Sequence, residues 1–178
     1  DRYRLGRVLG RGGFGVVFEA LDLKTDARRA VKMMRPPPSG DLTPLRRFER
    51  EVEIVESLEH PGIVKIYDSG TFDDDILFYV MELLEGQDLA DALERGAFTL
   101  RDAIEVAVEL LEALAVAHEA GVVHRDIKPA NIFLADDDEA YVRLLDFGIA
   151  RAVGGDDGLT KTGLIVGTPR YMPPESAL

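Results

Sequence analysis

The chain has 178 residues, of which 46% are hydrophobic and 30% charged, a composition typical of a folded globular protein and not of a disordered one. Its net charge of −12 argues against a nucleic-acid binder that works through bulk positive charge, but it is compatible with phosphate chemistry at a few placed cations. The lack of cysteine excludes disulfides and thiolate chemistry and fits a cytoplasmic location, and no apolar run approaches the ~18 residues of a membrane span.

The first half of the chain has the pattern of a β-rich unit with one helix. The segment 2–22, with strand-forming residues on both sides of a glycine-rich turn, predicts two strands, and 28–34 predicts a third. The proline-rich segment 35–41 predicts a loop, after which a helix begins at Thr43 and runs to about Leu58. A hairpin of two further strands is expected around the acidic turn from Asp73 to Asp75.

The second half has the pattern of a mainly helical unit. A short helix follows Gly86, and a long helix is expected from Thr99 to Ala120. Short strands come next, and then a stretch rich in glycine, aspartate and threonine at 148–168. His118 lies on the apolar stripe of the long helix and is predicted to be packed and hydrogen-bonded, not functional. That stripe consists of Ile104, Ala107, Val108, Leu111, Leu114, Ala115 and His118.

The first candidate site is the glycine-rich segment GRGGFGVV at 10–17. Gly10, Gly12 and Gly15 form the pattern G-x-G-x-x-G, which is weak evidence by itself. The following residues favour a strand and not the helix of a dinucleotide-binding fold. A strand–turn–strand glycine loop suits a flap whose backbone N–H groups lie over phosphates, and a plain glycine-rich hairpin is the alternative.

The second candidate is Lys32, which lies within an apolar strand where an unpaired lysine is costly to bury. Glu51 falls inside the apolar arc of the following helix, where an acid needs a cation. We therefore expect Lys32 and Glu51 to pair. A lysine at a strand end that reaches water is the alternative.

The third candidate is the segment GVVHRDIKPANIFL at 121–134, which places charged groups between two apolar anchors. Asp126, Lys128 and Asn131 are held close by a stiff turn at Pro129, a mount that suits a base and a cation-binding amide oxygen. A salt-bridged turn would not call for the asparagine. The fourth candidate is Asp146, at the end of an apolar strand, where an acid is well placed for a metal ion.

Together and in this order, the four sites resemble the signature motifs of the eukaryotic-type serine/threonine protein kinases, in particular those of bacteria. The resemblance covers essentially the whole chain. The motifs are the glycine loop, AVK at 30–32, HRD at 124–126 with Asn131, DFG at 146–148, and the end of an activation segment, GTPRYMPPE, at 167–175. Five motifs at family-like spacing are far more specific than any one of them.

The resemblance implies an α+β fold with two lobes. The N-lobe, 1–83, would be an antiparallel sheet with one helix of the kind called αC, and 84–178 would be a partial, mainly helical C-lobe. The family continues with further C-lobe helices, so we expect the natural polypeptide to be longer than this segment. A membrane anchor in such a longer chain stays open.

By the same resemblance, the chain would transfer the γ-phosphoryl group of ATP to serine and threonine hydroxyls of proteins. Asp126 would be the catalytic base, and Lys128 would neutralise charge on the transferring group. Asn131 and Asp146 would hold Mg²⁺, with Mn²⁺ as the alternative ion. Lys32, held by Glu51, would bind the α- and β-phosphates. The other residues that would contact the nucleotide are Leu9, Gly10, Gly12, Gly15, Val17, Ala30, Met81, Glu82, Leu84 and Phe133.

The resemblance also implies control by phosphorylation of the activation loop, through Arg125 and a phosphate on Thr160 or Thr162. A homodimer would serve this autophosphorylation, and a polar loop without a regulatory role is the alternative for the two threonines. An apolar regulatory column of His124, Phe147, Val55 and Ile66 is implied as well.

Two other functions stay open. One is a pseudokinase scaffold, although Lys32, Asp126 and Asp146 are all present. The other is a small-molecule phosphotransferase, although that class generally lacks the segment at 167–175.

Overall fold

The computed structural model describes residues 2–12, 15–35, 43–73, 76–96, 98–136, 141–147, 149 and 171. Its elements are β1 (Tyr3–Gly12), β2 (Gly15–Asp22), β3 (Ala27–Met34), α1 (Thr43–Glu56), β4 (Ile66–Phe72), β5 (Ile76–Glu82), β6 (Gly86–Asp88), α2 (Leu89–Glu94), α3 (Leu100–Glu119), the 3₁₀ turn η1 (Pro129–Asn131), β7 (Ile132–Ala135) and β8 (Val142–Leu144). In this described part, no helix has the length and hydropathy needed to cross a bilayer.

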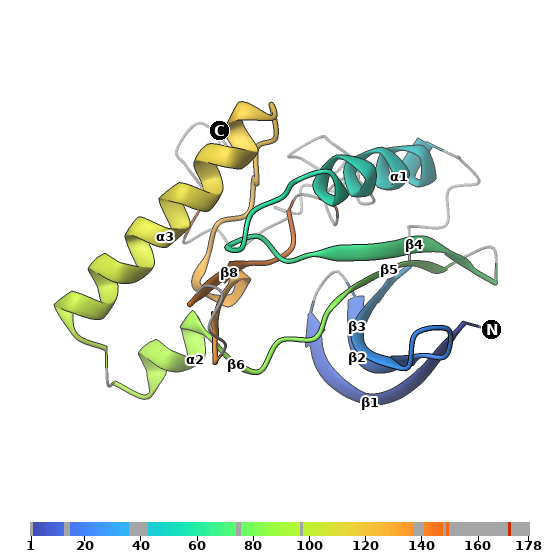
Figure 1. Cartoon of the computed structure of the whole chain (residues 1–178), viewed down its shortest axis with the longest axis horizontal. Coiled ribbons are helices and arrows are strands. Elements are labelled where there is room, and N and C mark those ends of the chain that lie inside the picture. The colour runs from blue at the N-terminus through green and yellow to red at the C-terminus, as the bar shows by residue number, and fades with distance from the viewer. Residues whose placement is uncertain are drawn as a thin grey trace, which may run out of the picture.

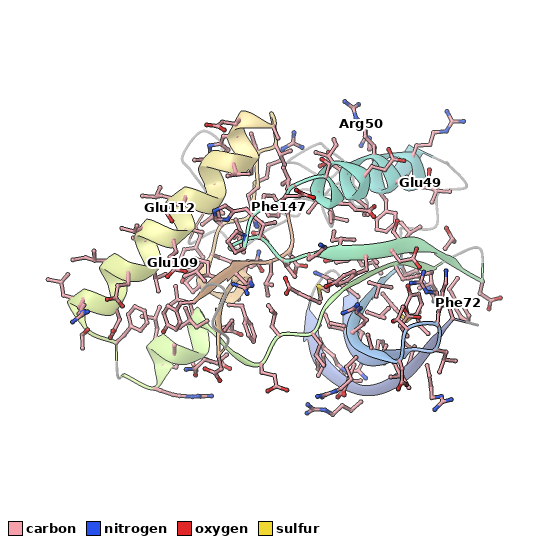
Figure 2. The ribbon with its side chains drawn as sticks, in the orientation of Figure 1. Glu49, Arg50, Phe72, Glu109, Glu112 and Phe147 are labelled. Carbon is pink, nitrogen blue, oxygen red and sulfur yellow. The ribbon has the colours of Figure 1, made fainter. Side chains whose placement is uncertain are left out.

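The N-terminal half forms a five-stranded antiparallel sheet in the order β1-β2-β3-β5-β4, as its alternating apolar pattern predicts. The expected hairpin is the β4–β5 pair. Helix α1 lies along the sheet near β4 (Figure 1). Its buried stripe of Phe48, Val52 and Val55 packs into the main core, and Glu49 and Arg50 project from the exposed side (Figure 2).

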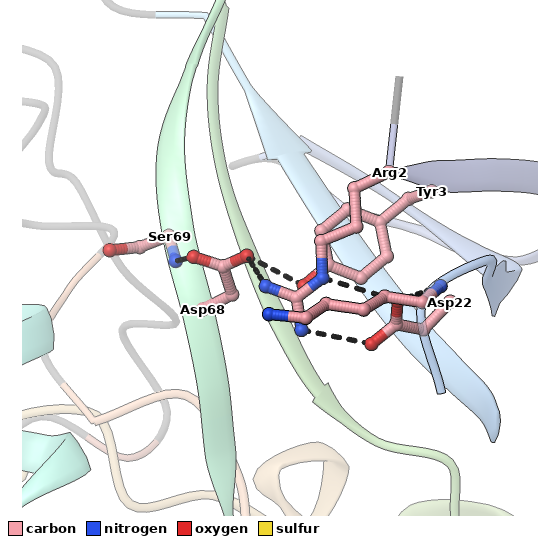
Figure 3. Close-up of polar contacts among 6 residues, drawn as sticks. Arg2, Tyr3, Asp22, Asp68 and Ser69 are labelled. Atoms are coloured by element: carbon pink, nitrogen blue, oxygen red, sulfur yellow. Dashed lines mark hydrogen bonds and ion pairs between the residues drawn. The ribbon is translucent and has the colours of Figure 1, made fainter. Parts of the chain in front are cut away.

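A polar network joins strands on the outer face of this sheet (Figure 3). Arg2 makes two hydrogen bonds to the carboxylate of Asp22, at 3.1 and 2.9 Å, and a third to Asp68 at 2.7 Å. The Tyr3 hydroxyl donates to the same Asp68 oxygen at 2.6 Å. The hydrogen bonds from Arg2 hold the pKa of the buried Asp22 carboxyl well below its ordinary value, so Asp22 stays charged and paired.

The second half packs α2, α3 and η1 around a small sheet in the order β6-β7-β8 (Figure 1). Helix α3 begins with a capping box: the Thr99 side chain accepts from the Asp102 N–H, and the Asp102 side chain accepts from the Thr99 N–H. The Glu109 carboxylate accepts the Val142 N–H at 2.9 Å, which ties the middle of α3 to β8.

The apolar stripe expected on α3 is not the face of the helix that packs. The helix buries Val106, Ala113 and Ala117, whereas three members of the predicted stripe, Ile104, Val108 and Leu111, are 56%, 50% and 64% exposed. His118 is exposed as well, so it is not the packed histidine that we expected. The helix has apolar residues on more than one face, and small alanines fit most closely against the neighbouring elements.

The segment 62–65 joins the two sheets through backbone hydrogen bonds. Val64 N–H donates to the Leu144 carbonyl at 3.1 Å, and Glu82 N–H donates to the Lys65 carbonyl at 3.0 Å. The side chain of Glu82 accepts the Lys65 N–H at 2.7 Å and lies 4.0 Å from the fully buried Arg143 of β8. The end of β5 is therefore tied to β8 before the chain crosses to β6.

Candidate active site between the two sheets

Asp146 lies where β8 meets the five-stranded sheet, and each of its carboxylate oxygens has a donor from that sheet. Lys32 of β3 donates to Oδ2, and the Tyr79 hydroxyl of β5 donates to Oδ1 at 2.6 Å. Burial by itself would raise the pKa of the Asp146 carboxyl, but the Lys32 charge and these hydrogen bonds outweigh burial and lower it. Asp146 therefore keeps the negative charge that a cation site needs.

The expected pair of Lys32 with Glu51 is not formed among the described residues, and this prediction is wrong for the structure seen here. Lys32 is paired with Asp146 instead. Glu51 lies at the edge of the buried stripe of α1, roughly 70° around the helix axis from its centre, and is half-buried. At that edge it lines a hollow with Arg47, Arg50 and Arg125, whose charges favour a carboxylate.

The loop after α3 brings Asp126, Lys128 and Asn131 together, as their spacing predicts. Lys128 donates to Oδ2 of Asp126 at 2.6 Å, and the Asn131 amide nitrogen donates to the same oxygen at 2.9 Å. The Asn131 amide also donates to the Asp126 carbonyl at 2.8 Å. These contacts turn the Asn131 nitrogen toward Asp126, so its amide oxygen is the atom available for a cation.

His124 is the buried mount of this loop. Its Nδ1 accepts the Asp126 N–H at 3.3 Å, and its Nε2 lies 2.7 Å from the Leu145 carbonyl, so the neutral ring donates there. Burial lowers the pKa of His124 below its ordinary value of 6.5. The neutral ring therefore contributes stability above pH 6.5 that is lost as pH falls through the lowered pKa. The ring packs on Phe147, 4.7 Å between centroids, which lies in the interior (Figure 2).

A cavity of about 470 Å³ opens beside Asp146 between the sheets. Eight of the predicted nucleotide-contacting residues line it: Leu9, Gly10, Val17, Ala30, Met81, Glu82, Leu84 and Phe133. Gly12, Gly15 and Lys32 do not line it, although Lys32 reaches its edge through Asp146. The walls combine apolar side chains with charged ones such as Arg28 and Asp146, so the cavity offers both an apolar surface and polar groups to a small molecule.

Glycine is present at the three positions of the loop for different structural reasons. A Cβ at Gly10 or Gly12 would meet nothing within 4 Å, so their backbone borders open space. Gly15 has a φ of +148°, and a Cβ there would lie 2.2 Å from the Met33 carbonyl oxygen. Gly15 is therefore required by the β2–β3 pairing, whereas Gly10 and Gly12 leave room for a ligand.

Sequence reasoning missed several polar residues of this region. Arg28 lines the cavity mouth and pairs with Glu19 at 2.9 Å and Glu85 at 3.6 Å, and Arg7 pairs with Glu19 at 2.9 Å. These side chains look like ordinary exposed strand charges, and only the strand register brings them together. Tyr79 was missed because a tyrosine in an apolar strand is typical of core packing.

The second hollow, of about 320 Å³, is lined by residues of α1 and of the segment after α3: Arg47, Arg50, Glu51, Ile54, Gly121, Val122, Val123 and Arg125. Three cations against one acid make it a place where an anion would be favoured. Arg125 itself has a φ of +65°, in the left-handed region. Gly148, Thr160 and Thr162 lie outside the described residues, as does most of the segment at 167–175.

The donor set fits a hard cation bound together with phosphates. No cluster of three or more His, Asp or Glu side chains that could hold a metal occurs in the described part of the chain. Mg²⁺, however, is commonly held by one or two carboxylates plus the phosphates of its nucleotide, and keeps several waters. The Asp146 carboxylate and the Asn131 amide oxygen supply oxygen ligands of that kind.

Comparisons with known proteins agree on one family. The model of the protein kinase domain matches residues 3–177. The chain is 40% identical to the serine/threonine-protein kinase PknA of Mycobacterium tuberculosis, over 99% of this chain and 42% of PknA. It is 39% identical to a Corynebacterium glutamicum protein named probable serine/threonine-protein kinase PknB, over 99% of this chain and 28% of that protein. The chain thus spans less than half the length of these relatives.

The fold agrees with this similarity. The crystal structure of the M. tuberculosis PknI kinase domain matches with a TM-score of 0.73 at 30% identity, over 83% of this chain and 59% of that chain. A double mutant of the same domain matches with a TM-score of 0.75, also at 30% identity and over the same shares of the two chains. Most of this chain therefore shares its fold with a solved kinase domain.

Proposed function

The chain belongs to the protein kinase family, and from this premise we propose that it transfers the γ-phosphoryl group of ATP to serine and threonine hydroxyls of proteins. The observation that carries the proposal is the cluster of Asp126, Lys128 and Asn131 near the Lys32–Asp146 pair, beside a cavity of nucleotide size. We propose residues 1–83 as the N-lobe, 84–178 as part of the C-lobe, and the cytoplasm, where ATP is available, as the location.

Asp126 is the proposed base. Its carboxylate accepts the proton of the substrate hydroxyl and orients that hydroxyl toward the γ-phosphorus. Lys128 lies against the same carboxylate, so its ammonium group is in place to neutralise charge that develops on the transferring oxygens. His124 holds the backbone of Asp126 and so fixes where the base points.

The nucleotide is proposed to bind in the 470 Å³ cavity. Val17 and Ala30 cover one face of the adenine, Phe133 covers the other, and the backbone of Glu82 and Leu84 binds its edge. Glu82 is suited to this because hydrogen bonds between its N–H and side chain and the Lys65 backbone hold its own backbone in a fixed position. Lys32 binds the α- and β-phosphates, which requires its ammonium group to turn from Asp146.

Asn131 and Asp146 are proposed to hold Mg²⁺, with Mn²⁺ as a substitute. A cation held there would supply positive charge that neutralises the phosphates. In the structure Lys32 occupies Oδ2 of Asp146 and is not paired with Glu51. This arrangement differs from the one proposed for catalysis, in which Lys32 holds phosphates with Glu51 beside it.

The hollow of Arg47, Arg50, Glu51 and Arg125 supports regulation by phosphorylation. A phosphate on Thr160 or Thr162 carries a charge of roughly −1.5 to −2 and pairs well with arginine. Such a group at the hollow would draw in the arginines of α1 and leave Glu51 without its favourable neighbours. We propose that this releases Glu51 toward Lys32. A homodimer would bring the loop of one copy to the active site of another.

Replacing Arg47 and Arg50 together by glutamine should blunt this activation. The activity gained on phosphorylation of Thr160 or Thr162 is expected to fall on the order of 10-fold, because two hydrogen bonds to a charged group are lost. The measurement compares the rates of phosphorylated and phosphatase-treated protein. Arg46→Gln, at an exposed position of α1 outside the hollow, is the matched control and should keep the full gain.

The proposed activity is tested by incubating the full-length protein with ATP and Mg²⁺ and mapping phosphate by mass spectrometry, with Lys32→Met as the inactive control. Phosphate on Thr160, Thr162 or a protein substrate, absent with the variant, is the expected result. ATP binding without any transfer would favour the pseudokinase scaffold. Transfer to a panel of small alcohols but to no protein would favour a small-molecule phosphotransferase.

A further inference from the structure

One buried hydroxyl has no part in the transfer described above, that of Tyr79 in β5. Tyr79 is 2% exposed, and its hydroxyl donates to Oδ1 of Asp146 at 2.6 Å. Lys32 donates to the other oxygen, Oδ2. Both oxygens of the carboxylate at the proposed cation site are therefore hydrogen-bonded to side chains of the five-stranded sheet, which come from positions distant in the chain.

The strand register accounts for this grip. Lys32 and Tyr79 are directly opposite each other in the antiparallel β3–β5 pair. Side chains at opposed positions of such a pair point to the same face of the sheet and lie side by side. The register therefore delivers an ammonium group and a phenol hydroxyl to the same carboxylate, with one donor for each oxygen.

The two donors, Lys32 and Tyr79, differ in whether they can keep their hydrogen bond to Asp146 during the reaction. Lys32 has a flexible stem and, in the proposed function, must turn its ammonium group toward phosphates. Tyr79 has a rigid ring and a neutral hydroxyl that adds no charge to the site. A phenol hydroxyl keeps its proton at neutral pH, so it remains a donor to the carboxylate. Its grip on Oδ1 can persist when Lys32 leaves.

The backbone of Asp146 makes such a grip useful. Its φ of +55° lies in the left-handed region, which is uncommon for a residue with a side chain and persists where the surroundings hold it. Phe147, the next residue, is fully buried on the His124 ring. The packing of Phe147 fixes the next residue along the chain, and the Tyr79 hydrogen bond is a second restraint on the orientation of the Asp146 carboxylate.

We propose that Tyr79 is the positioning residue of Asp146, and that its hydroxyl holds Oδ1 so that Oδ2 faces the divalent cation that accompanies ATP. The inference rests on the proposed function, because it takes Asp146 as a cation ligand. Tyr79 does not line the nucleotide cavity. Its effect should therefore be on cation-linked binding and not on the affinity for the nucleotide alone.

The test is Tyr79→Phe, which removes one oxygen and keeps the ring. Binding of a non-hydrolysable ATP analogue is measured by calorimetry, once with EDTA and once with saturating MgCl₂. With EDTA the affinity should match wild type within about twofold. The gain in affinity that Mg²⁺ provides should fall roughly 10-fold, since loss of a residue that orients a metal ligand typically costs 10-fold to 100-fold.

The matched control is Tyr3→Phe. Tyr3 also donates a hydroxyl to a carboxylate at 2.6 Å, but that carboxylate is Asp68 on the outer face of the sheet. Tyr3→Phe should lower stability and leave the gain from Mg²⁺ unchanged. In an Asp146→Asn background, Tyr79→Phe should have no further effect on the gain, because it acts through Asp146. Tyr79→Met, also without a hydroxyl, replaces the phenylalanine variant if the latter fails to fold.

A full gain from Mg²⁺ in Tyr79→Phe would overturn the inference even if the protein is an active kinase. A wild-type protein without any gain from Mg²⁺ would overturn it too, because Asp146 would then hold no cation. An absence of phosphoryl transfer, by contrast, would count against the proposed function alone, since the readout here is binding.

Discussion

Asp126→Asn should lower the rate of phosphoryl transfer about 10³-fold, with little effect on ATP binding. A general base contributes typically 10²-fold to 10⁴-fold, and an amide of the same size cannot take the proton. Asp126 does not line the nucleotide cavity, so the KM for ATP should stay within roughly threefold of wild type. Steady-state kinetics over a range of ATP concentrations, together with calorimetric binding of ADP, separate the two quantities.

The control for this variant is Asp102→Asn. Asp102 closes the capping box at the start of α3, on an exposed stretch away from the loop of Asp126. It should lower stability by about 1 kcal/mol and leave kcat unchanged. If Asp126→Asn kept more than a tenth of the wild-type rate, Asp126 would not be the base.

Gly15→Ala should cost about 3 kcal/mol of unfolding free energy and with it most of the activity at 37 °C. The φ of +148° is strained for any residue with a side chain, and the new Cβ would lie 2.2 Å from the Met33 carbonyl. Backbone cannot yield as a flexible side chain does, so β2 and β3 must move apart. Chemical denaturation monitored by circular dichroism gives the free energy directly.

Gly12→Ala is the contrasting variant. A Cβ at Gly12 meets nothing within 4 Å, so the unfolding free energy should change by less than about 0.5 kcal/mol. Its effect should be on the KM for ATP, because Gly12 belongs to the glycine loop whose backbone N–H groups are expected to lie over the phosphates. Equal loss of stability in both variants would contradict the separate roles of the two glycines.

Most of the fold followed from periodicity. The β4–β5 hairpin and helix α1 lie where alternation and the start at Thr43 predict them. The orientation of α3 did not follow, because Ile104 and Val108 form as good an apolar stripe as the one that is buried. Periodicity finds an apolar face but cannot rank two of them when the packing partners are distant in the chain.

The residues of the candidate site could be predicted from the sequence, but the partner that each residue contacts was harder to predict. Asp126, Lys128 and Asn131 are near in sequence, and a stiff turn brings them together as expected. The predicted partner of Lys32 was wrong, because the sequence cannot rank the two acids Glu51 and Asp146 when the choice depends on where α1 lies. Contacts between residues near in sequence follow from their spacing, whereas contacts between distant residues depend on the tertiary structure.

The facing positions of Lys32 and Tyr79 limit which insertions and deletions strands β3 and β5 can tolerate. Many point substitutions in β3 or β5 alter one side chain and leave the pairing intact. A one-residue insertion or deletion in either strand would instead turn one of the two side chains to the opposite face of the sheet. These strands should therefore tolerate amino-acid substitutions but hardly any insertion or deletion, unlike the surface turns that join them.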